Sequence, residues 1–224
     1  MPVATRTQRG RDADRSRVAI LEAAERLFAE HGFGGTSLGD IGAAAGLSRG
    51  TPSYFYGSKE QLYVAVLEHV FAEREQATEA AFASVHEWAA GGDGSLERAL
   101  TSAARGYMAF LLARPTFVRL LEWEELTGGR RLHAAPRPSR AIEDAFQAVR
   151  AAAGRRGLRR FRVDDAVLIF VSLTFSPLAQ RATFMVALGR DLDDPATMRR
   201  HVALVVDQLL HVVGPKQEAR DAAR

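Results

Sequence analysis

Apolar residues recur at helical spacing along almost the whole of this chain of 224 residues, and no stretch has the alternation typical of a β-strand. Glycine and proline interrupt the pattern at intervals. The uninterrupted stretches predict about nine helices, over residues 15–31, 38–46, 48–55, 59–88, 96–113, 116–126, 139–153, 163–189 and 195–213. We therefore expect an all-α protein, with a kink at Pro177 in the eighth helix.

The composition limits what such a helical protein can do. Apolar residues make up 47% of the chain and charged residues 25%, a balance typical of soluble globular proteins. The chain has no cysteine, which excludes disulfides, thiolate metal sites and cysteine catalysis and fits a reducing cytoplasm. The most apolar run, residues 166–175, is shorter than the roughly 18 residues that a membrane span needs. We expect a cytoplasmic protein that does not bind a membrane.

Positive charge is concentrated in two places, although the net charge of +3 is too small to indicate nucleic-acid binding by itself. Five arginines against two acids lie between residues 6 and 17. We expect residues 1–14 to form a disordered arginine-rich arm, which is either solvated or follows the DNA backbone. A second arginine cluster, residues 155–162, is expected to be a solvated loop, and residues 215–224 a flexible tail.

The most informative pattern lies between residues 36 and 60. Ser37 and Asp40 form an S-x-x-D capping box that opens a short helix. Gly46 permits the positive φ that a tight turn between helices needs, and Ser48 can cap a second short helix. Two short helices joined in this way have the proportions of a helix-turn-helix. The second of them carries hydroxyl groups and Arg49, which suit contact with DNA phosphates and bases.

The same segment resembles the DNA-binding domain of the tetracycline-repressor (TetR) family of bacterial regulators. The resemblance spans residues 15–63 and rests on Thr36-Ser37-Leu38-x-x-Ile41, Ala45-Gly46-Leu47-Ser48-Arg49-Gly50-Thr51, the aromatic residues at 54–56 and Ser58-Lys59-Glu60-Gln61-Leu62. Pro52 and Gly57 depart from the commonest family pattern, and Pro52 removes one helix hydrogen bond. The rest of the chain resembles the family only in its layout.

The resemblance implies a homodimeric repressor that binds a pseudo-palindromic operator in double-stranded DNA and is released by a small-molecule effector. It implies a DNA-binding domain over residues 15–60 and a ligand-binding and dimerisation domain over residues 61–214. The implied DNA-binding residues are Thr36, Ser37, Gly46, Ser48, Arg49, Gly50, Thr51, Ser53, Tyr54, Tyr56 and Lys59. For Ser37 a pure capping role, and for Lys59 a solvated position, are the alternatives.

Outside this segment the sequence indicates function only through its apolar residues. Candidates to line an effector pocket are Tyr107, Phe110, Trp123 and Phe146, and a glutamate near Trp123 is either a pocket carboxylate for a cationic ligand or a surface residue. The last two helices are apolar around their circumference, which predicts a two-fold interface with candidates Phe170, Phe175, Val202, Val206, Leu209 and Val213.

An enzyme built on a helical scaffold is the alternative to a regulator. The chain lacks the nucleophile-elbow, zinc-protease, Walker and dinucleotide motifs. Asp207 and His211 are four residues apart, but no third metal ligand follows at a matching spacing. We therefore expect no enzyme activity, no cofactor and no metal.

Overall fold

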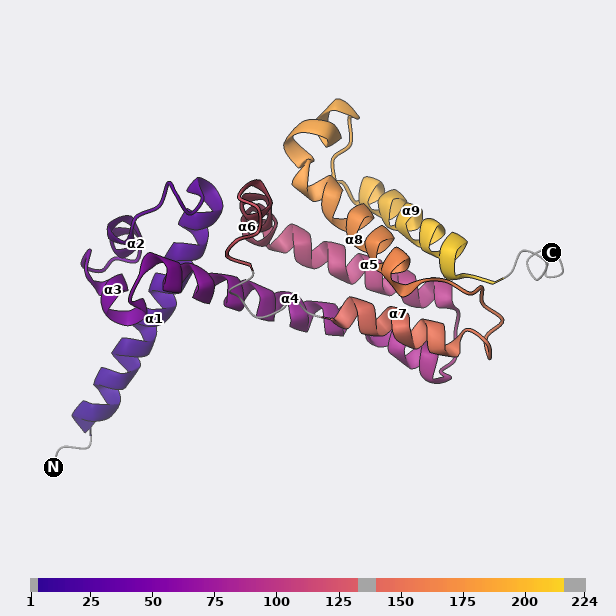
Figure 1. Ribbon diagram of the computed structural model, residues 1–224, viewed down its shortest axis with the longest axis horizontal. Helices are drawn as coiled ribbons and strands as arrows, with labels where there is room; N and C mark the ends of the chain where they lie inside the picture. The colour runs from indigo at the N-terminus through magenta and orange to yellow at the C-terminus, as the bar shows by residue number, and fades with distance from the viewer. Residues whose placement is uncertain (1–3, 133–139, 216–224) are drawn as a thin grey trace. The chain divides into compact units, whose positions relative to one another are not determined.

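The computed structural model describes residues 4–132 and 140–215, and their side chains from Gly10 onward. Within these residues the fold is all-α, as predicted (Figure 1). The helices are α1 (Ala4–His31), α2 (Leu38–Ala44), α3 (Thr51–Tyr56), α4 (Lys59–Ala90), α5 (Leu96–Ala113), α6 (Pro115–Leu126), α7 (Ala141–Ala152), α8 (Val163–Ala179), the short π-helix η1 (Arg181–Met185) and α9 (Pro195–Val213). No helix of the described residues is long and apolar enough to cross a membrane.

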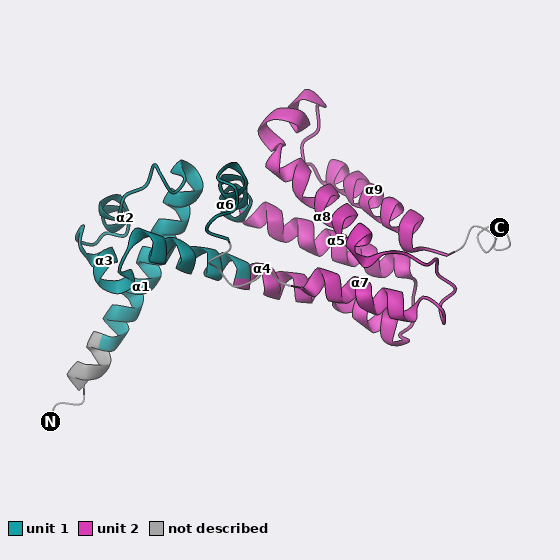
Figure 2. Ribbon diagram, in the orientation of Figure 1, with its two compact units in different colours: residues 1–71, 115–138 teal, residues 72–114, 139–224 magenta. Residues whose placement is uncertain are grey.

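The chain divides into two compact units (Figure 2). Unit 1 comprises residues 1–71 and 115–138, and unit 2 comprises residues 72–114 and 139–224. Helix α4 contributes to both units, and α6 belongs to unit 1 because it packs against α1. The Trp123 indole of α6 donates a hydrogen bond to the Ala29 carbonyl of α1 at 3.2 Å. Unit 1 is therefore larger than the predicted domain over residues 15–60.

Helix α1 begins at Ala4, which corrects the prediction of a disordered arm over residues 1–14. Residues 1–3 lie outside the described part. The arginines and alanines in this stretch have high helix propensity. Local contacts add support, because the Ser16 hydroxyl donates to the Asp12 carbonyl at 3.0 Å and Arg15 pairs with Asp12 one turn away at 3.5 Å.

Each unit has its own apolar core. In unit 1, the fully buried rings of Phe28 and Tyr63 meet edge to face with centroids 4.8 Å apart. In unit 2, Phe170 lies at the centre of an aromatic cluster, 5.0 Å from Phe82 and 5.3 Å from Tyr107. Phe146 closes this cluster at 6.2 Å from Phe170. The cores explain why the chain needs no disulfide at this size.

The eighth predicted helix, residues 163–189, is shorter in the structure. Helix α8 ends at Ala179, two residues after Pro177, and five residues of π-helix follow. Proline lacks an N–H, so within α8 the Leu173 carbonyl four residues earlier has no helical amide donor. Helix α9 begins as predicted, because the Asp194 carboxylate accepts hydrogen bonds from the Ala196 and Thr197 amides and Pro195 occupies the first turn.

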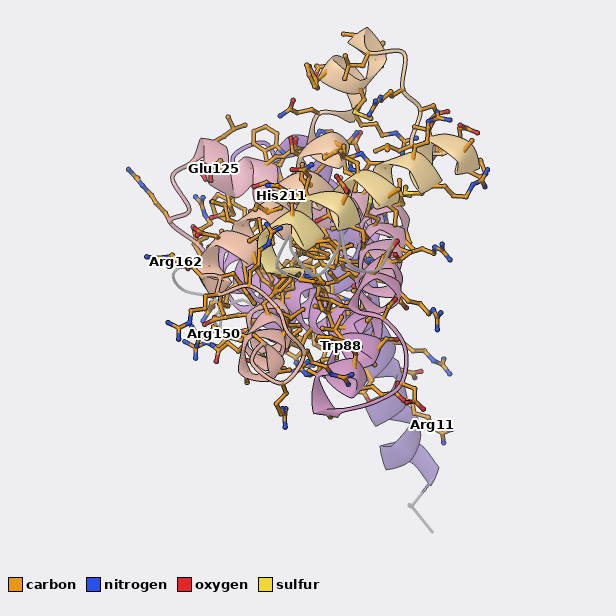
Figure 3. All side chains as sticks on the ribbon, turned by 90° about the vertical axis from the view of Figure 1, so that its right-hand side faces the viewer. Arg11, Trp88, Glu125, Arg150, Arg162 and His211 are labelled. Carbon is orange, nitrogen blue, oxygen red and sulfur yellow. The ribbon has the colours of Figure 1, made fainter. Side chains whose placement is uncertain are left out.

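The arginine cluster at 155–162 is not a solvated loop throughout. Arg156 donates to the Trp88 and Gly92 carbonyls at 2.9 and 3.0 Å, and its guanidinium lies 4.9 Å from the Trp88 ring. Arg159 donates to the His211 carbonyl at 2.7 Å. The Trp88 and His211 carbonyls lie in the last turns of α4 and α9, and the Gly92 carbonyl lies just after α4, positions at which a cationic side chain stabilises a helix end. Arg162, at the end of the same cluster, is exposed. Figure 3 labels it together with Trp88 and His211.

Candidate nucleic-acid interface

Helix α2 and the turn after it follow the prediction closely. The Ser37 hydroxyl accepts a hydrogen bond from the Asp40 amide at 3.1 Å, and the Ser37 amide donates to the Asp40 carboxylate at 3.3 Å. A hydrogen bond from the Ser37 hydroxyl lowers the pKa of Asp40. Gly46 has a φ of 70°, and the Leu47 amide donates to the Gly42 carbonyl at 2.9 Å. The capping box and the glycine turn are both confirmed.

Helix α3 starts later than predicted. It runs from Thr51 to Tyr56, with Gly50 as its N-cap and no side-chain capping bond. Pro52 occupies the first turn, where a proline needs no amide partner and its fixed φ favours the helix. Ser48 is therefore not the helix cap. Its hydroxyl instead lies 2.7 Å from the Thr51 hydroxyl, at the entrance to α3.

Most of the residues predicted to contact DNA are exposed on α2, the turn and α3. Tyr54 is 84% exposed, and Arg49 and Ser53 are exposed beside it. Ser37, Gly46, Ser48 and Gly50 are also exposed, and Thr51 is half-buried. These eight residues form what we call the α3 face: Ser37, Gly46, Ser48, Arg49, Gly50, Thr51, Ser53 and Tyr54. The α3 face presents hydroxyls, a guanidinium and a phenol together.

Thr36 and Lys59 have structural roles in the free protein, and a DNA contact by Lys59 stays a prediction. Thr36 is buried, and its hydroxyl donates to the Gly32 carbonyl at 2.9 Å and to the Leu27 carbonyl at 3.1 Å. The Lys59 ammonium donates to the Phe33 carbonyl at 2.9 Å and the Thr36 carbonyl at 3.0 Å, and lies 4.2 Å from the Phe33 ring. Both side chains hold the α1–α2 connection in place.

Tyr56 is also used within the protein. Its hydroxyl donates to the Arg17 carbonyl of α1 at 3.0 Å, and burial raises its pKa. The Arg17 guanidinium lies 5.4 Å from the neighbouring Phe55 ring. These contacts join the end of α3 to α1. The described arginines of the N-terminal stretch, Arg11, Arg15 and Arg17, are exposed, and Arg11 is labelled in Figure 3.

A buried polar cluster in unit 1 contains one of the glutamates near Trp123, whose partners were not predicted from the sequence. Glu124 is only 1% exposed, and its carboxylate accepts hydrogen bonds from the Tyr63 hydroxyl at 2.9 Å and from the Arg131 and Leu132 amides at 3.1 and 3.2 Å. The Arg131 guanidinium lies 3.8 Å from the Phe33 ring. Glu124 is thus the buried glutamate near Trp123, and this chain's own Arg131 occupies the cationic position beside it. A helix pattern alone gave no signal for a charge on the buried face.

The four predicted pocket residues have different surroundings. Tyr107 and Phe146 are buried in the aromatic cluster of unit 2, and Phe110 is half-buried 6.4 Å from the Tyr107 ring. Trp123 belongs to unit 1 and borders a cavity of about 340 Å³. The Trp123 ring lies so close to Gly32 that a Cβ atom added to Gly32 would lie 3.0 Å from the ring. The φ of 69° at Gly32 also favours glycine.

The predicted dimer residues are mostly core residues, which corrects that prediction. Phe170 is fully buried in the aromatic cluster, and the four valine and leucine candidates of α9 face the interior of the single chain: Val202, Val206, Leu209 and Val213. Phe175 is half-buried. The exposed large apolar residues of this region are others, namely Leu168 of α8, Phe184 of η1, Val186 and Leu188 just after η1, and Leu204 of α9. Periodicity identified the apolar helices, but it could not identify which of their residues are buried within the single chain.

Two family models match this chain. Residues 20–66 match the family model described as bacterial regulatory proteins, tetR family, and residues 97–209 match the tetracyclin repressor-like C-terminal domain. The HTH-type transcriptional repressor NicS of Pseudomonas putida is 28% identical over 90% of this chain and 94% of its own length. The regulator RutR of Escherichia coli is 41% identical over 68 residues, 30% of this chain and 32% of its own length.

Solved structures share the fold. A TetR-family transcriptional regulator from Mesorhizobium loti superposes with a TM-score of 0.67 at 21% identity, covering 90% of this chain and 98% of that one. The transcriptional regulator SCO4942 from Streptomyces coelicolor superposes with a TM-score of 0.64 at 21% identity, covering 90% and 99%.

Proposed function

Because this chain belongs to the TetR family and is a DNA-binding transcriptional regulator, we propose that it represses transcription as a homodimer bound to a pseudo-palindromic operator. A small-molecule effector releases the dimer from the operator. In this proposal α3 is the recognition helix and enters the major groove of double-stranded DNA.

The observation that carries the proposal is the α3 face. Arg49, Ser53 and Tyr54 are exposed, while the residues that support them from behind are held by hydrogen bonds within unit 1. A guanidinium at the start of a recognition helix suits a base edge or a phosphate, and hydroxyls suit phosphates.

The two-fold interface is proposed on the exposed apolar residues of unit 2. Leu168 is 66% exposed and Phe184 is 57% exposed in the single chain. Side chains of this size gain most from burial against a second copy. Because α8 and α9 already pack on each other within the chain, a second copy would form a four-helix arrangement from the outward stripes of both.

The effector site is proposed in unit 2. The C-terminal family model covers residues 97–209, which lie largely in this unit. Helix α4 carries residues of both units, 59–71 in unit 1 and 72–90 in unit 2, so it connects an effector in unit 2 with the DNA-binding residues. A coupling of about 1–3 kcal/mol between the two sites would be typical of such regulators.

The test compares the affinities of two arginine variants for a DNA fragment that flanks the gene encoding this protein. Arg49→Ala should weaken specific binding by about 1–3 kcal/mol, because Arg49 lies on the α3 face. Arg26→Ala is the matched control, since Arg26 is also exposed, on α1, but lies outside the α3 face. Equal affinities for both variants and the unaltered protein would refute the assignment of α3.

A further inference from the structure

The arginines around the connection between α7 and α8 differ in their partners. Arg156 and Arg159 donate hydrogen bonds to backbone carbonyls at the ends of α4 and α9. Arg162 forms an ion pair with an aspartate in the first turn of α8. The guanidiniums of Arg160 and of Arg150, in the last turn of α7, form no ion pair or hydrogen bond with another of the described residues. These two cations therefore have their donors available.

Both of these arginines line the same cavity. The cavity has a volume of about 660 Å³ and lies along the end of α7 and the connection that follows it. Arg150, Arg159 and Arg160 line it, and its described lining includes no aspartate or glutamate. Small-molecule sites have volumes of roughly 300–1,000 Å³, so the cavity has room for a ligand. Because its charged lining is only positive, the cavity favours an anion.

This cavity is separate from the aromatic core of unit 2. The described residues that line it all lie between positions 150 and 161. Phe161 is the aromatic residue among them, and it is half-buried. The rings of the core cluster do not line the cavity, namely Phe82, Tyr107, Phe146 and Phe170. The cavity therefore lies on the surface of the unit and not among its core helices.

Hydrogen bonds fix the segment that forms the cavity. The amide of the buried Leu158 donates to the Ala153 carbonyl at 2.9 Å, and the Arg159 amide donates to the Gly214 carbonyl at 3.0 Å. Gly157 supplies the positive φ, 65°, that the turn between α7 and α8 needs. The cavity is thus formed before a ligand binds, which reduces the cost of binding.

A neighbouring cavity of about 730 Å³ shares Arg150 and Phe161 but also contains Glu143 and Asp164. These two acids have partners of their own. Glu143 accepts a hydrogen bond from a glutamine one turn later at 3.1 Å, and Asp164 is paired with Arg162. The acids make the neighbouring cavity the less favourable of the two for an anion. Figure 3 labels Arg150 and Arg162, which are both exposed.

Two available guanidiniums and one aromatic ring define the ligand. A phosphate group carries a charge of about −1.5 to −2 at pH 7 and has three acceptor oxygens, so it can accept from two guanidiniums at once. The planar donor fork of arginine suits phosphate oxygens in particular. The ring of Phe161 offers a surface against which a planar ring packs. A nucleotide has both of these parts.

We propose that Arg150, Arg160 and Phe161 form a nucleotide site on the surface of unit 2. The phosphate lies on the two arginines and the base packs against Phe161. This site is additional to the operator surface and to the effector site proposed above. Its test requires neither of them, so the failure of one proposal leaves the other unaffected.

The first measurement titrates the full-length protein with AMP, adenosine and inorganic phosphate in a calorimeter. AMP should bind with a Kd of about 1 mM or below. Adenosine lacks the phosphate and inorganic phosphate lacks the ring, so each should bind at least about fivefold more weakly than AMP. Absence of AMP binding, or equal binding of AMP and either fragment, would overturn the proposal.

The second measurement removes one arginine at a time. Arg150→Gln and Arg160→Gln should each weaken AMP binding by about fivefold, because each removes a charged donor at an exposed site. Arg162→Gln is the matched control, since it removes the same charge from the same cluster but lies outside the lining of the cavity. Equal losses for the three variants would overturn the proposal, because AMP would then respond only to the general positive charge.

The third measurement fills the cavity without removing a charge. Gly154 lines the cavity, and a Cβ atom added to it meets no atom within 4 Å. Gly154→Leu should therefore keep the melting temperature of the unaltered protein and weaken AMP binding by at least about fivefold. Gly34→Leu is the control, because Gly34 is equally open but belongs to unit 1. A folded Gly154→Leu protein that binds AMP like the unaltered protein would place the nucleotide elsewhere and overturn the proposal.

Discussion

The Nε2 atom of His201 in α9 lies 2.7 Å from the carbonyl oxygen of Leu173 in α8. Pro177 is four residues after Leu173, so this carbonyl lacks the amide donor that a regular helix would supply. A carbonyl can only accept, so Nε2 carries the proton. His201 therefore supplies from α9 the hydrogen bond that the proline removed from α8, while its Nδ1 is buried without a partner.

This relationship predicts a non-additive pair of substitutions. His201→Phe leaves the Leu173 carbonyl without its donor and should lower the free energy of unfolding by about 1–3 kcal/mol. Pro177→Ala restores a backbone N–H, so His201→Phe should cost less in that background. Chemical denaturation of the four proteins measures the cycle. Equal costs of His201→Phe in both backgrounds would mean that Pro177 and His201 are not coupled.

Lys59 should affect stability more than DNA affinity. Lys59→Met removes the ammonium that donates to the Phe33 and Thr36 carbonyls, and should lower the free energy of unfolding by about 1.5–3 kcal/mol. The dependence of operator binding on salt should keep its slope, because no phosphate contact is lost. A slope reduced by about one unit with unchanged stability would instead indicate a phosphate ligand.

Tyr63 should make the protein sensitive to high pH. Burial, and then the hydrogen bond to Glu124, raises the pKa of Tyr63 above its usual range. A raised folded-state pKa stabilises the protein fully below the unfolded pKa of about 10, and this contribution is lost as the pH rises above it. The free energy of unfolding should therefore fall above pH ~10, by up to about 1.4 kcal/mol per pH unit from this group. Tyr63→Phe should reduce the slope of the unfolding free energy against pH above pH ~10 by that amount. Tyr54→Phe, at an exposed position, should leave this slope unchanged.

Arg156 and Arg160 should differ although they belong to one arginine cluster. Arg156→Ala removes the hydrogen bonds to the Trp88 and Gly92 carbonyls at the end of α4 and should cost about 1–3 kcal/mol of stability. Arg160 is exposed, so Arg160→Ala should change stability by less than about 0.5 kcal/mol. Thermal unfolding compares the two, and equal effects would contradict the capping role.

The sequence predicted those features that depend on neighbouring residues. The capping box at Ser37 and Asp40, the turn at Gly46 and the start of α9 at Asp194 are local hydrogen-bond patterns, and all three are confirmed. The roles of Lys59 and Tyr56 could not be predicted, because their partners lie 26 and 39 residues away in sequence.

The dimer prediction failed for a related reason. Helix α8 is apolar on more than one side, so periodicity could not distinguish a stripe that packs within the chain from one that packs on a second copy. Helix α9 is amphipathic, and its apolar stripe packs within the chain. Burial in the single chain separates Val206, which is buried, from Leu168, which is exposed.

That separation yields the last prediction. Leu168→Glu places a charge on an exposed apolar position and should weaken the dimer by at least tenfold while the monomer remains folded, because no core contact is lost. Val206→Glu places a charge in the core and should unfold the chain. Operator affinity should fall with the dimer, since one subunit contacts only a half-site. Sedimentation at several concentrations and circular dichroism measure assembly and folding separately. A Leu168→Glu protein that sediments and binds DNA like the unaltered protein would exclude this stripe of α8 from the interface.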